Sequence, residues 1–126
     1  MEQLIFHLLG DHVFQSHWMA TEKTKRSGVA LLHANIYSLP FLMIGSPLAF
    51  LVILVTHFFM DRFRLARYVI FARNKLLGKW ESMMTWEDCN GTGYPSDTPV
   101  WLAVWLMIIC DNTIHLAINY AALRWL

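Results

Sequence analysis

The chain has 126 residues, of which 56% are hydrophobic and 15% are charged, and its formal net charge is +1. Soluble domains carry about 25% charged and about 45–50% apolar residues, so this composition excludes an ordinary soluble domain. The mean hydropathy of +0.40 agrees with that reading. The basic residues flank apolar segments instead of forming one basic face, so they do not indicate nucleic acid as a partner. We expect a single integral membrane domain over residues 1–126.

Four helices are expected along the chain, over residues 3–20, 28–45, 47–78 and 98–125. Polar residues interrupt the first, so whether it crosses the bilayer stays open. The second and third form a membrane hairpin around Gly45-Ser46-Pro47, and the third continues as a basic, amphipathic extension on the cytoplasmic membrane surface. After one loop, Thr98 and Pro99 begin the last helix as N-cap and first-turn proline. The expected fold class is all-α, a small polytopic four-helix bundle.

Basic residues predict the orientation of these helices. They fall in two of the connectors, at Lys23, Lys25, Arg26 and then at Arg62, Arg64, Arg67, Arg73, Lys75 and Lys79. By the positive-inside rule these connectors are cytoplasmic and the uncharged turn at residues 45–47 is outside. The side of the N-terminus depends on the first helix and stays open. The expected interface anchors are Trp80, Trp101, Trp105 and Trp125.

Histidine–aspartate pairs recur in the apolar segments at the spacing of one helical turn. Chance placement of the six histidines and five aspartates would give about half of one such pair. The chain has three pairs, on three predicted helices, and a further histidine on the remaining helix: His7 with Asp11, His57 with Asp61, Asp111 with His115, and His33. An aspartate inside a membrane helix costs about 2.5–3.5 kcal/mol. A shared divalent cation would offset that cost by neutralising the carboxylates.

The sequence therefore predicts an Asp/His site for one or two divalent metal ions. The candidate ligands are His7, Asp11, His33, His57, Asp61, Asp111 and His115, and the candidate catalytic residues are the aspartates Asp11, Asp61 and Asp111. Oxygen and imidazole ligands without a thiolate favour Zn, Mn or Fe, and helix bundles hold such metal sites between facing helices.

Four further residues are expected near this site. Gln15 and Asn119 each lie one helical turn beyond a pair, where they would hydrogen bond to a ligand and orient it. Arg62 and Arg64 follow Asp61 and are candidates for binding a substrate anion. The alternative for both arginines is anchoring at the membrane surface.

Three segments resemble a known family. They are HLLGDHVFQSHWMA, THFFMDRFRLA and DNTIHLAINY, and His33 lies between the first two. Together they are similar, over nearly the whole chain, to short polytopic membrane proteins of unknown function from bacteria and phages. That family has the pattern His-Leu-x-Gly-Asp, Thr-His-x-x-x-Asp and Asp-Gln-x-x-His, so Asn112 stands here where Gln is usual. The resemblance implies a multi-pass protein of the bacterial inner membrane and supports the same ligand set.

The family is also distantly similar to membrane-bound metal-dependent hydrolases with His/Asp motifs on transmembrane helices. We therefore expect a membrane-embedded metal-dependent hydrolase acting on a phosphoester or a lipid-linked anionic substrate. Two alternatives stay open: a non-enzymatic metal-binding or transport protein, and a phage-encoded interaction protein whose His–Asp pairs are interhelical hydrogen bonds. Membrane lipid is the expected partner, and a homo-oligomer is left open.

Overall fold

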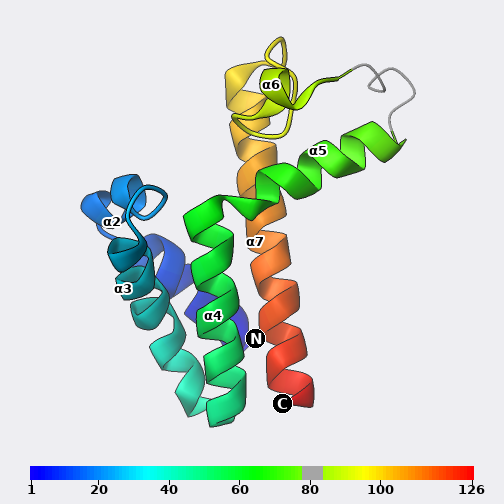
Figure 1. Cartoon of the computed structure of the whole chain (residues 1–126). Helices are drawn as coiled ribbons and strands as arrows, with labels where there is room; N and C mark the ends of the chain where they lie inside the picture. The colour runs from blue at the N-terminus through cyan, green and yellow to red at the C-terminus, as the bar shows by residue number, and fades with distance from the viewer. Residues whose placement is uncertain (78–83) are drawn as a thin grey trace. The chain divides into compact units, whose positions relative to one another are not determined.

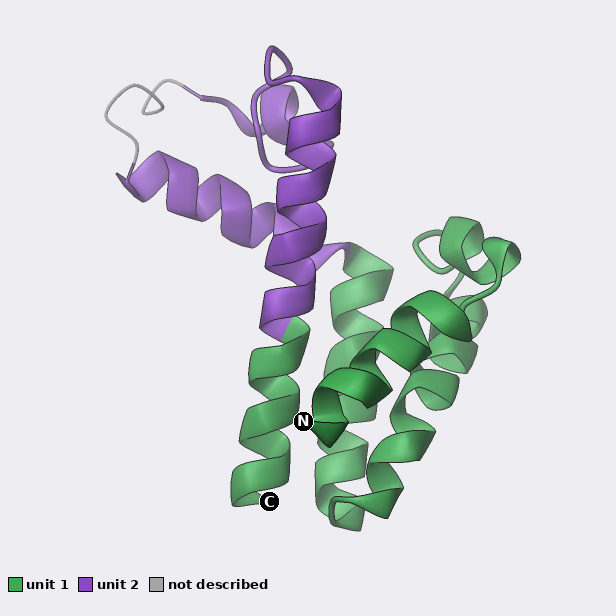
Figure 2. Cartoon of the chain, turned by 180° about the vertical axis from the view of Figure 1, so that it is seen from behind, with its two compact units in different colours: residues 1–63, 115–126 green, residues 64–114 purple. Residues whose placement is uncertain are grey.

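The computed structural model describes residues 1–77 and 84–126, which form helices joined by turns and contain no strand (Figure 1). The all-α prediction is confirmed for this part of the chain. Residue 78, where the third predicted helix ends, and the predicted flank and anchor Lys79 and Trp80 lie outside the described residues. The chain divides into two compact units, Met1–Phe63 with His115–Leu126, and Arg64–Ile114 (Figure 2).

The first predicted helix, residues 3–20, is instead three short helices. They are α1 (Glu2–Leu8), the π-helix η1 (Leu9–Val13) and α2 (His17–Glu22). The amide of Phe14 donates to the carbonyl of Leu9, five residues back, at 2.8 Å, which is the π-helical spacing. The hydroxyl of Ser16 caps α2 by accepting from the amide of Met19 at 3.2 Å. Each piece is shorter than the about 17 residues that cross a bilayer.

The π-helix lies close to α3 (Ser27–Ser38) because Gly10 has no side chain. A Cβ atom added to Gly10 would lie 2.5 Å from Cδ2 and 3.1 Å from Cα of Tyr37. Only glycine fits so close an approach of two backbones. This contact brings the next residue, Asp11, toward α3.

A helical hairpin forms the centre of the first unit. In it α3 and the 3-10 turn η2 (Leu39–Met43) are followed by α4 (Pro47–Phe63), and α3 and α4 lie side by side (Figure 1). The hydroxyl of Ser46 accepts from the amide of Ala49 at 3.1 Å and so caps α4, which begins with Pro47. The hydrophobic core of the hairpin consists of Tyr37, Phe41, Ala49 and Ile53 together with Ala122 of the last helix.

The third predicted helix, residues 47–78, is also interrupted. Arg64 has a φ of 51°, in the left-handed region, and it separates α4 from α5 (Leu65–Leu77). A non-glycine residue in this region ends a helix. No glycine or proline marks the position, so the periodic pattern alone predicted one helix where the structure has two.

The second unit contains α5, the short α6 (Trp86–Cys89) and the first part of α7 (Val100–Trp125). The buried face of α5 includes Ile70 and Asn74, and the Asn74 side chain donates to the carbonyl of Gly93 at 3.5 Å. Gly93 has a φ of 86°, which favours glycine. The last helix begins directly after Pro99, close to its predicted start.

Within the described residues, α7 alone is long and apolar enough to cross a membrane by length and composition, and 11% of its apolar window is buried. The hairpin segment Ser27–Met43 is apolar but shorter. One possible membrane helix is thus established. The multi-pass four-helix bundle remains a prediction.

Candidate metal centre

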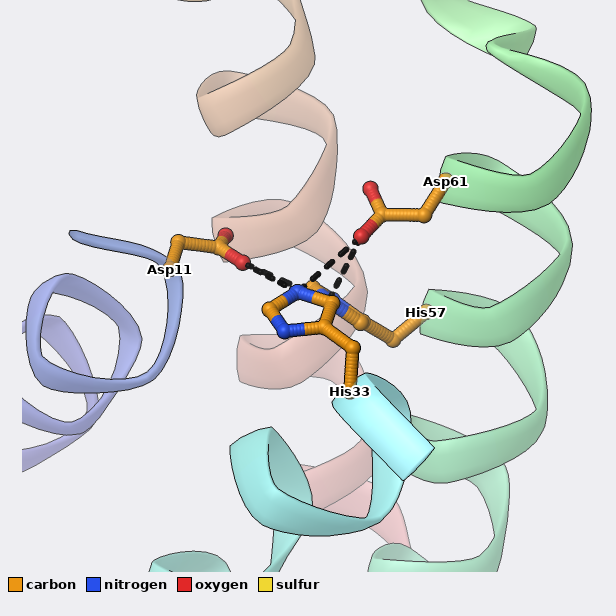
Figure 3. A group of neighbouring side chains, drawn as sticks. All are labelled: Asp11, His33, His57 and Asp61. Atoms are coloured by element: carbon orange, nitrogen blue, oxygen red, sulfur yellow. Dashed lines mark hydrogen bonds and ion pairs between the residues drawn. The ribbon is translucent and has the colours of Figure 1, made fainter. Parts of the chain in front are cut away.

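Four buried side chains from three helical segments converge in the first unit (Figure 3). The π-helix η1 supplies Asp11, α3 supplies His33, and α4 supplies His57 and Asp61, which are one helical turn apart. All four belong to the buried residues of the chain. Figure 3 shows the four side chains pointing toward one another from these three segments.

The ligand atoms form a compact group. Atom Nε2 of His33 lies 3.1 Å from Asp11 Oδ1 and 3.1 Å from Asp61 Oδ2. Atom Nε2 of His57 lies 3.3 Å from Asp11 Oδ1 and 3.2 Å from Asp61 Oδ2. The two Nε2 atoms are 3.1 Å apart. All four atoms lie within 4.8 Å of one another.

These separations fit one metal ion. Around a tetrahedral ion with metal–ligand distances of about 2.0 Å, two ligand atoms lie about 3.3 Å apart. An imidazole nitrogen carries either one proton or one lone pair, so it makes one good hydrogen bond. Here Nε2 of His57 has three polar neighbours within 3.3 Å. A shared cation would account for this close grouping of ligand atoms, and the cluster could therefore hold a metal ion.

The charge of the cluster also suits a cation. Burial raises the pKa of the Asp11 carboxyl, but hydrogen bonds with His33 and His57 outweigh burial and hold that pKa well below its usual range. Asp11 is therefore ionised at neutral pH. A carboxylate that is both buried and charged is a ligand that a divalent ion can neutralise.

A histidine lies behind each ligand carboxylate. Nδ1 of His7 is 3.4 Å from Asp11 Oδ2, and Nε2 of His115 is 3.6 Å from Asp61 Oδ1. Nδ1 of His115 also lies 3.2 Å from Nδ1 of His57. When Nε2 of His57 binds a metal, its Nδ1–H can donate to His115, which fixes the ring for ligation.

Tyr37 supports the cluster from α3. Its ring stacks on that of His57 with the centroids 3.6 Å apart and an angle of 13° between the planes. Its hydroxyl oxygen accepts from the side-chain amide of Asn119 at 2.6 Å and lies 2.8 Å from Nδ1 of His7. Tyr37 was not predicted, because an aromatic residue in an apolar helix gives no sign of such a role.

Lys23 is a second residue that the sequence did not assign to the site. It ends α2, and its Nζ lies 2.7 Å from Asp61 Oδ2 and 3.3 Å from Nε2 of His33. Its side chain is 15% exposed, more than that of any cluster residue. The basic residues of this connector, Lys23, Lys25 and Arg26, indicate membrane orientation by the positive-inside rule. Their pattern does not show which of them points toward the cluster.

A family match covers this site. Residues 1–81 match the model of a family described as "Protein of unknown function (DUF3307)". The chain belongs to this family. The matched region includes all four cluster residues as well as His7, Lys23 and Tyr37, whereas His115 lies beyond it. No curated protein and no solved structure matches the chain.

Family membership confirms the predicted resemblance to an uncharacterised family. The description assigns no activity, so the function of this chain has to be argued from the chemistry of the site. The site offers four ligand atoms of the imidazole and carboxylate type, from four of the seven predicted ligands.

The structure separates the seven predicted ligands into three groups. Those brought to one centre are Asp11, His33, His57 and Asp61. The second group, His7 and His115, lies behind the carboxylates. The last, Asp111, belongs to the second unit, so its place among the ligands remains a prediction.

The other predicted site residues also have partners in the structure. Gln15 donates to the backbone carbonyl of Asp11 at 3.1 Å. Arg62 donates to the carbonyl of Thr24 at 2.6 Å, and Arg64 donates to the carbonyl of Gly91 at 2.8 Å. Anion binding by the two arginines remains a prediction.

Proposed function

We propose that this chain is a membrane-embedded, metal-dependent hydrolase that cleaves a phosphoester at a mononuclear Asp/His centre. The observation that supports the proposal is the convergence of two imidazole nitrogens and two carboxylate oxygens, in which each nitrogen lies 3.1–3.3 Å from both oxygens and from the other nitrogen. A divalent metal bound there would lower the pKa of a coordinated water and polarise a phosphoryl oxygen.

The residues of the chain would bind the ion and handle the proton of the attacking water. Asp11 and Asp61 each use one oxygen in the cluster, and the second oxygen of each lies beside a histidine, at 3.4 Å from His7 and 3.6 Å from His115. The imidazole beside each carboxylate is the better candidate for taking up that proton, because the lowered pKa of Asp11 makes its carboxylate a weak general base. Burial of the cluster limits the access of bulk water to the reaction.

The distribution of polarity supports the membrane part of the proposal. The first unit buries histidines, aspartates and Asn119, while the outer face of α4 presents apolar residues at helical spacing that are 41–53% exposed, namely Leu48, Leu51, Val55 and Phe59. Soluble domains bury apolar side chains, and a large exposed apolar face marks contact with a partner or lipid. We place the hairpin in the bacterial inner membrane, with lipid as its partner.

A non-enzymatic metal-binding protein is the second candidate. It is favoured by the number of protein ligands, because four side chains can fill a tetrahedral zinc ion, whereas catalytic zinc sites keep one position for water. Turnover of a phosphoester distinguishes the two functions, since a carrier or storage protein binds the same ion without product formation.

Metal binding by the detergent-purified protein tests the proposal. After chelation, the wild type is titrated with Zn²⁺, Mn²⁺ and Fe²⁺, and we expect one ion per chain and phosphoester turnover that depends on it. Substitution of a residue that only orients a ligand typically lowers metal affinity about 10–100-fold. Asp11→Asn and Asp61→Asn should lower it further, because each removes a ligand oxygen. The control is His12→Gln, because His12 is exposed and adjacent to Asp11.

Circular dichroism of each variant shows whether the helices are retained. A wild type that binds no metal, or an Asp61→Asn variant that is folded and binds as tightly as the wild type, would contradict the proposal. Metal binding with no turnover of any phosphoester would favour the second candidate.

A further inference from the structure

We infer that Lys23 is the substrate-recognition residue of the metal centre, and that its ammonium binds an anionic phosphoryl oxygen. The inference rests on the proposed function and adds a residue and a substrate charge to it. It starts from the position of Nζ, which is 2.7 Å from Asp61 Oδ2 and 3.3 Å from Nε2 of His33. The ammonium is therefore next to two ligand atoms at once.

Lys23 is also more exposed than the cluster side chains. It is 15% exposed, whereas the histidine and aspartate side chains of the cluster are between 0% and 9% exposed. A substrate that approaches the ligand atoms on this side meets the ammonium first. The ammonium of Lys23 thus lies where it can attract an incoming anionic group.

The balance of charge then selects the substrate. The two aspartates carry two negative charges, which a divalent ion neutralises, and the ammonium of Lys23 is left as one surplus positive charge. Once Asp61 is shared with the ion, the ammonium needs a second anionic partner, because an uncompensated charge in a buried site is unfavourable. A phosphoryl oxygen supplies that partner, and lysine is a common phosphate-binding residue because of its compact charge. A neutral carboxylic ester or amide leaves the ammonium uncompensated.

The connector that carries Lys23 is fixed to α4 next to the ligands. Arg62 follows Asp61, and its guanidinium donates to the carbonyl of Thr24 at 2.6 Å and to the hydroxyl of Ser27 at 3.2 Å. These contacts hold both sides of the turn between α2 and α3. Such anchoring is expected for a positioned group and is not needed for a lysine that only marks the membrane surface.

Lys25 in the same connector provides a matched control. It forms an ion pair with Glu22 at 3.1 Å, and its side chain is 65% exposed. Lys23→Gln and Lys25→Gln therefore remove the same charge from the same turn, once at the cluster and once at the surface. Lys23→Arg keeps the charge and is expected to retain part of the binding.

The first experiment measures binding of inorganic phosphate by calorimetry. We expect phosphate to bind to the metal-loaded wild type and to lose about tenfold or more in affinity in metal-loaded Lys23→Gln, with no change in Lys25→Gln. Lys23→Gln should bind Zn²⁺ at least as tightly as the wild type, because a positive charge beside Asp61 is removed. Unchanged phosphate affinity in metal-loaded Lys23→Gln overturns the inference and leaves the metal centre intact.

A second measurement uses only the wild type, so it holds even where Lys23→Gln does not fold. Inorganic phosphate should protect Lys23, and not Lys25, from acetylation by an amine reagent when the protein is metal-loaded, as detected by mass spectrometry. Equal labelling of Lys23 with and without phosphate overturns the inference. Failure of the wild type to bind any metal overturns the proposed function itself, so the two failures are distinguishable.

Two substrate arms separate the possible sources of the phosphoryl group. One uses para-nitrophenyl phosphate in solution and the other phosphatidic acid in detergent micelles, with para-nitrophenyl acetate as the neutral ester. Loss of turnover in Lys23→Gln for either phosphate, without a similar loss for the acetate, supports the inference and identifies the source as soluble or lipid. An equal loss for phosphate and acetate overturns it.

Discussion

At the residue scale, Tyr37 contacts the site through both its ring and its hydroxyl. Its ring stacks on His57, and its hydroxyl lies between the side chains of Asn119 and His7. The stacking limits how the His57 ring can turn, and the hydroxyl ties α3 to α1 and to the last helix. Because these two contributions come from different atoms, one substitution can separate them.

Tyr37→Phe removes the hydroxyl and keeps the ring. Leaving a buried polar group without its hydrogen-bond partner lowers stability by about 1–3 kcal/mol. We therefore expect the free energy of unfolding to fall by that amount, as measured by denaturant titration in detergent. Metal affinity should fall less than in His57→Gln, since the stacked ring remains. The control is Tyr120→Phe, because Tyr120 is 55% exposed. Equal stability of the two variants would contradict this role.

The residues of the site were predictable to different degrees, for physical reasons. His57 and Asp61 are one turn apart in an apolar helix, which the helical period makes visible from the sequence alone. Lys23 could not be found in this way, since a lysine in a basic connector already has an explanation in membrane orientation. Which histidines are ligands and which lie behind them depends on distances between helices, and no spacing within one helix encodes these.

At the element scale, the hairpin of α3 and α4 was predictable and the breaks in the other helices were not. Gly45, Ser46 and Pro47 carry the turn and cap signals that local chemistry requires. By contrast, Arg64 adopts a left-handed conformation without the glycine that would indicate it in the sequence. The π-helix at Leu9–Val13 was not predictable either. No residue pattern marks the change from i→i+4 to i→i+5 hydrogen bonds, and here the segment packs closely against α3.

Gly10 is the residue on which that packing depends. A Cβ here would lie 2.5 Å from a side-chain atom and 3.1 Å from a backbone atom of Tyr37, so Gly10→Ala should displace η1 and move Asp11 away from His33. We expect loss of metal affinity together with a lower melting temperature, measured by calorimetry and thermal unfolding.

Gly28→Ala is the matched control for this prediction. A Cβ at Gly28, in the first turn of α3, would meet nothing within 4 Å. Alanine there should be neutral or stabilise the helix by about 0.5–1 kcal/mol. If Gly10→Ala binds metal as well as Gly28→Ala does, the close approach of η1 is not what positions Asp11.

At the scale of the whole molecule, the described residues are all-α, and the first unit buries histidines and aspartates beside its apolar core while apolar side chains are exposed on α4. Helical periodicity was sufficient to predict helices, whereas the lipid environment that the composition indicates remains a prediction. The division into two units was not predictable, since one boundary lies at Arg64, which no glycine or proline marks, and the other lies within α7. Whether the hairpin lies in lipid can be tested on its outer face.

Val55 and Val69 allow a matched test of that environment. Both are exposed, by 41% on α4 and by 48% on α5. On a water-facing surface Val55→Lys should change stability by no more than about 0.5 kcal/mol, whereas in lipid a lysine costs about 2.5–3.5 kcal/mol. We expect the large effect for Val55→Lys and a small one for Val69→Lys, measured as unfolding in bilayer-like micelles. Equal small effects would contradict membrane embedding of α4.

X-ray absorption spectroscopy of the zinc-loaded protein shows directly whether Asp11, His33, His57 and Asp61 hold one divalent ion. We expect nitrogen and oxygen atoms bound to the zinc at about 2.0–2.1 Å, with the scattering signature of two imidazoles. A shell of water oxygens without imidazole scattering, or sulfur atoms at about 2.3 Å, would contradict it.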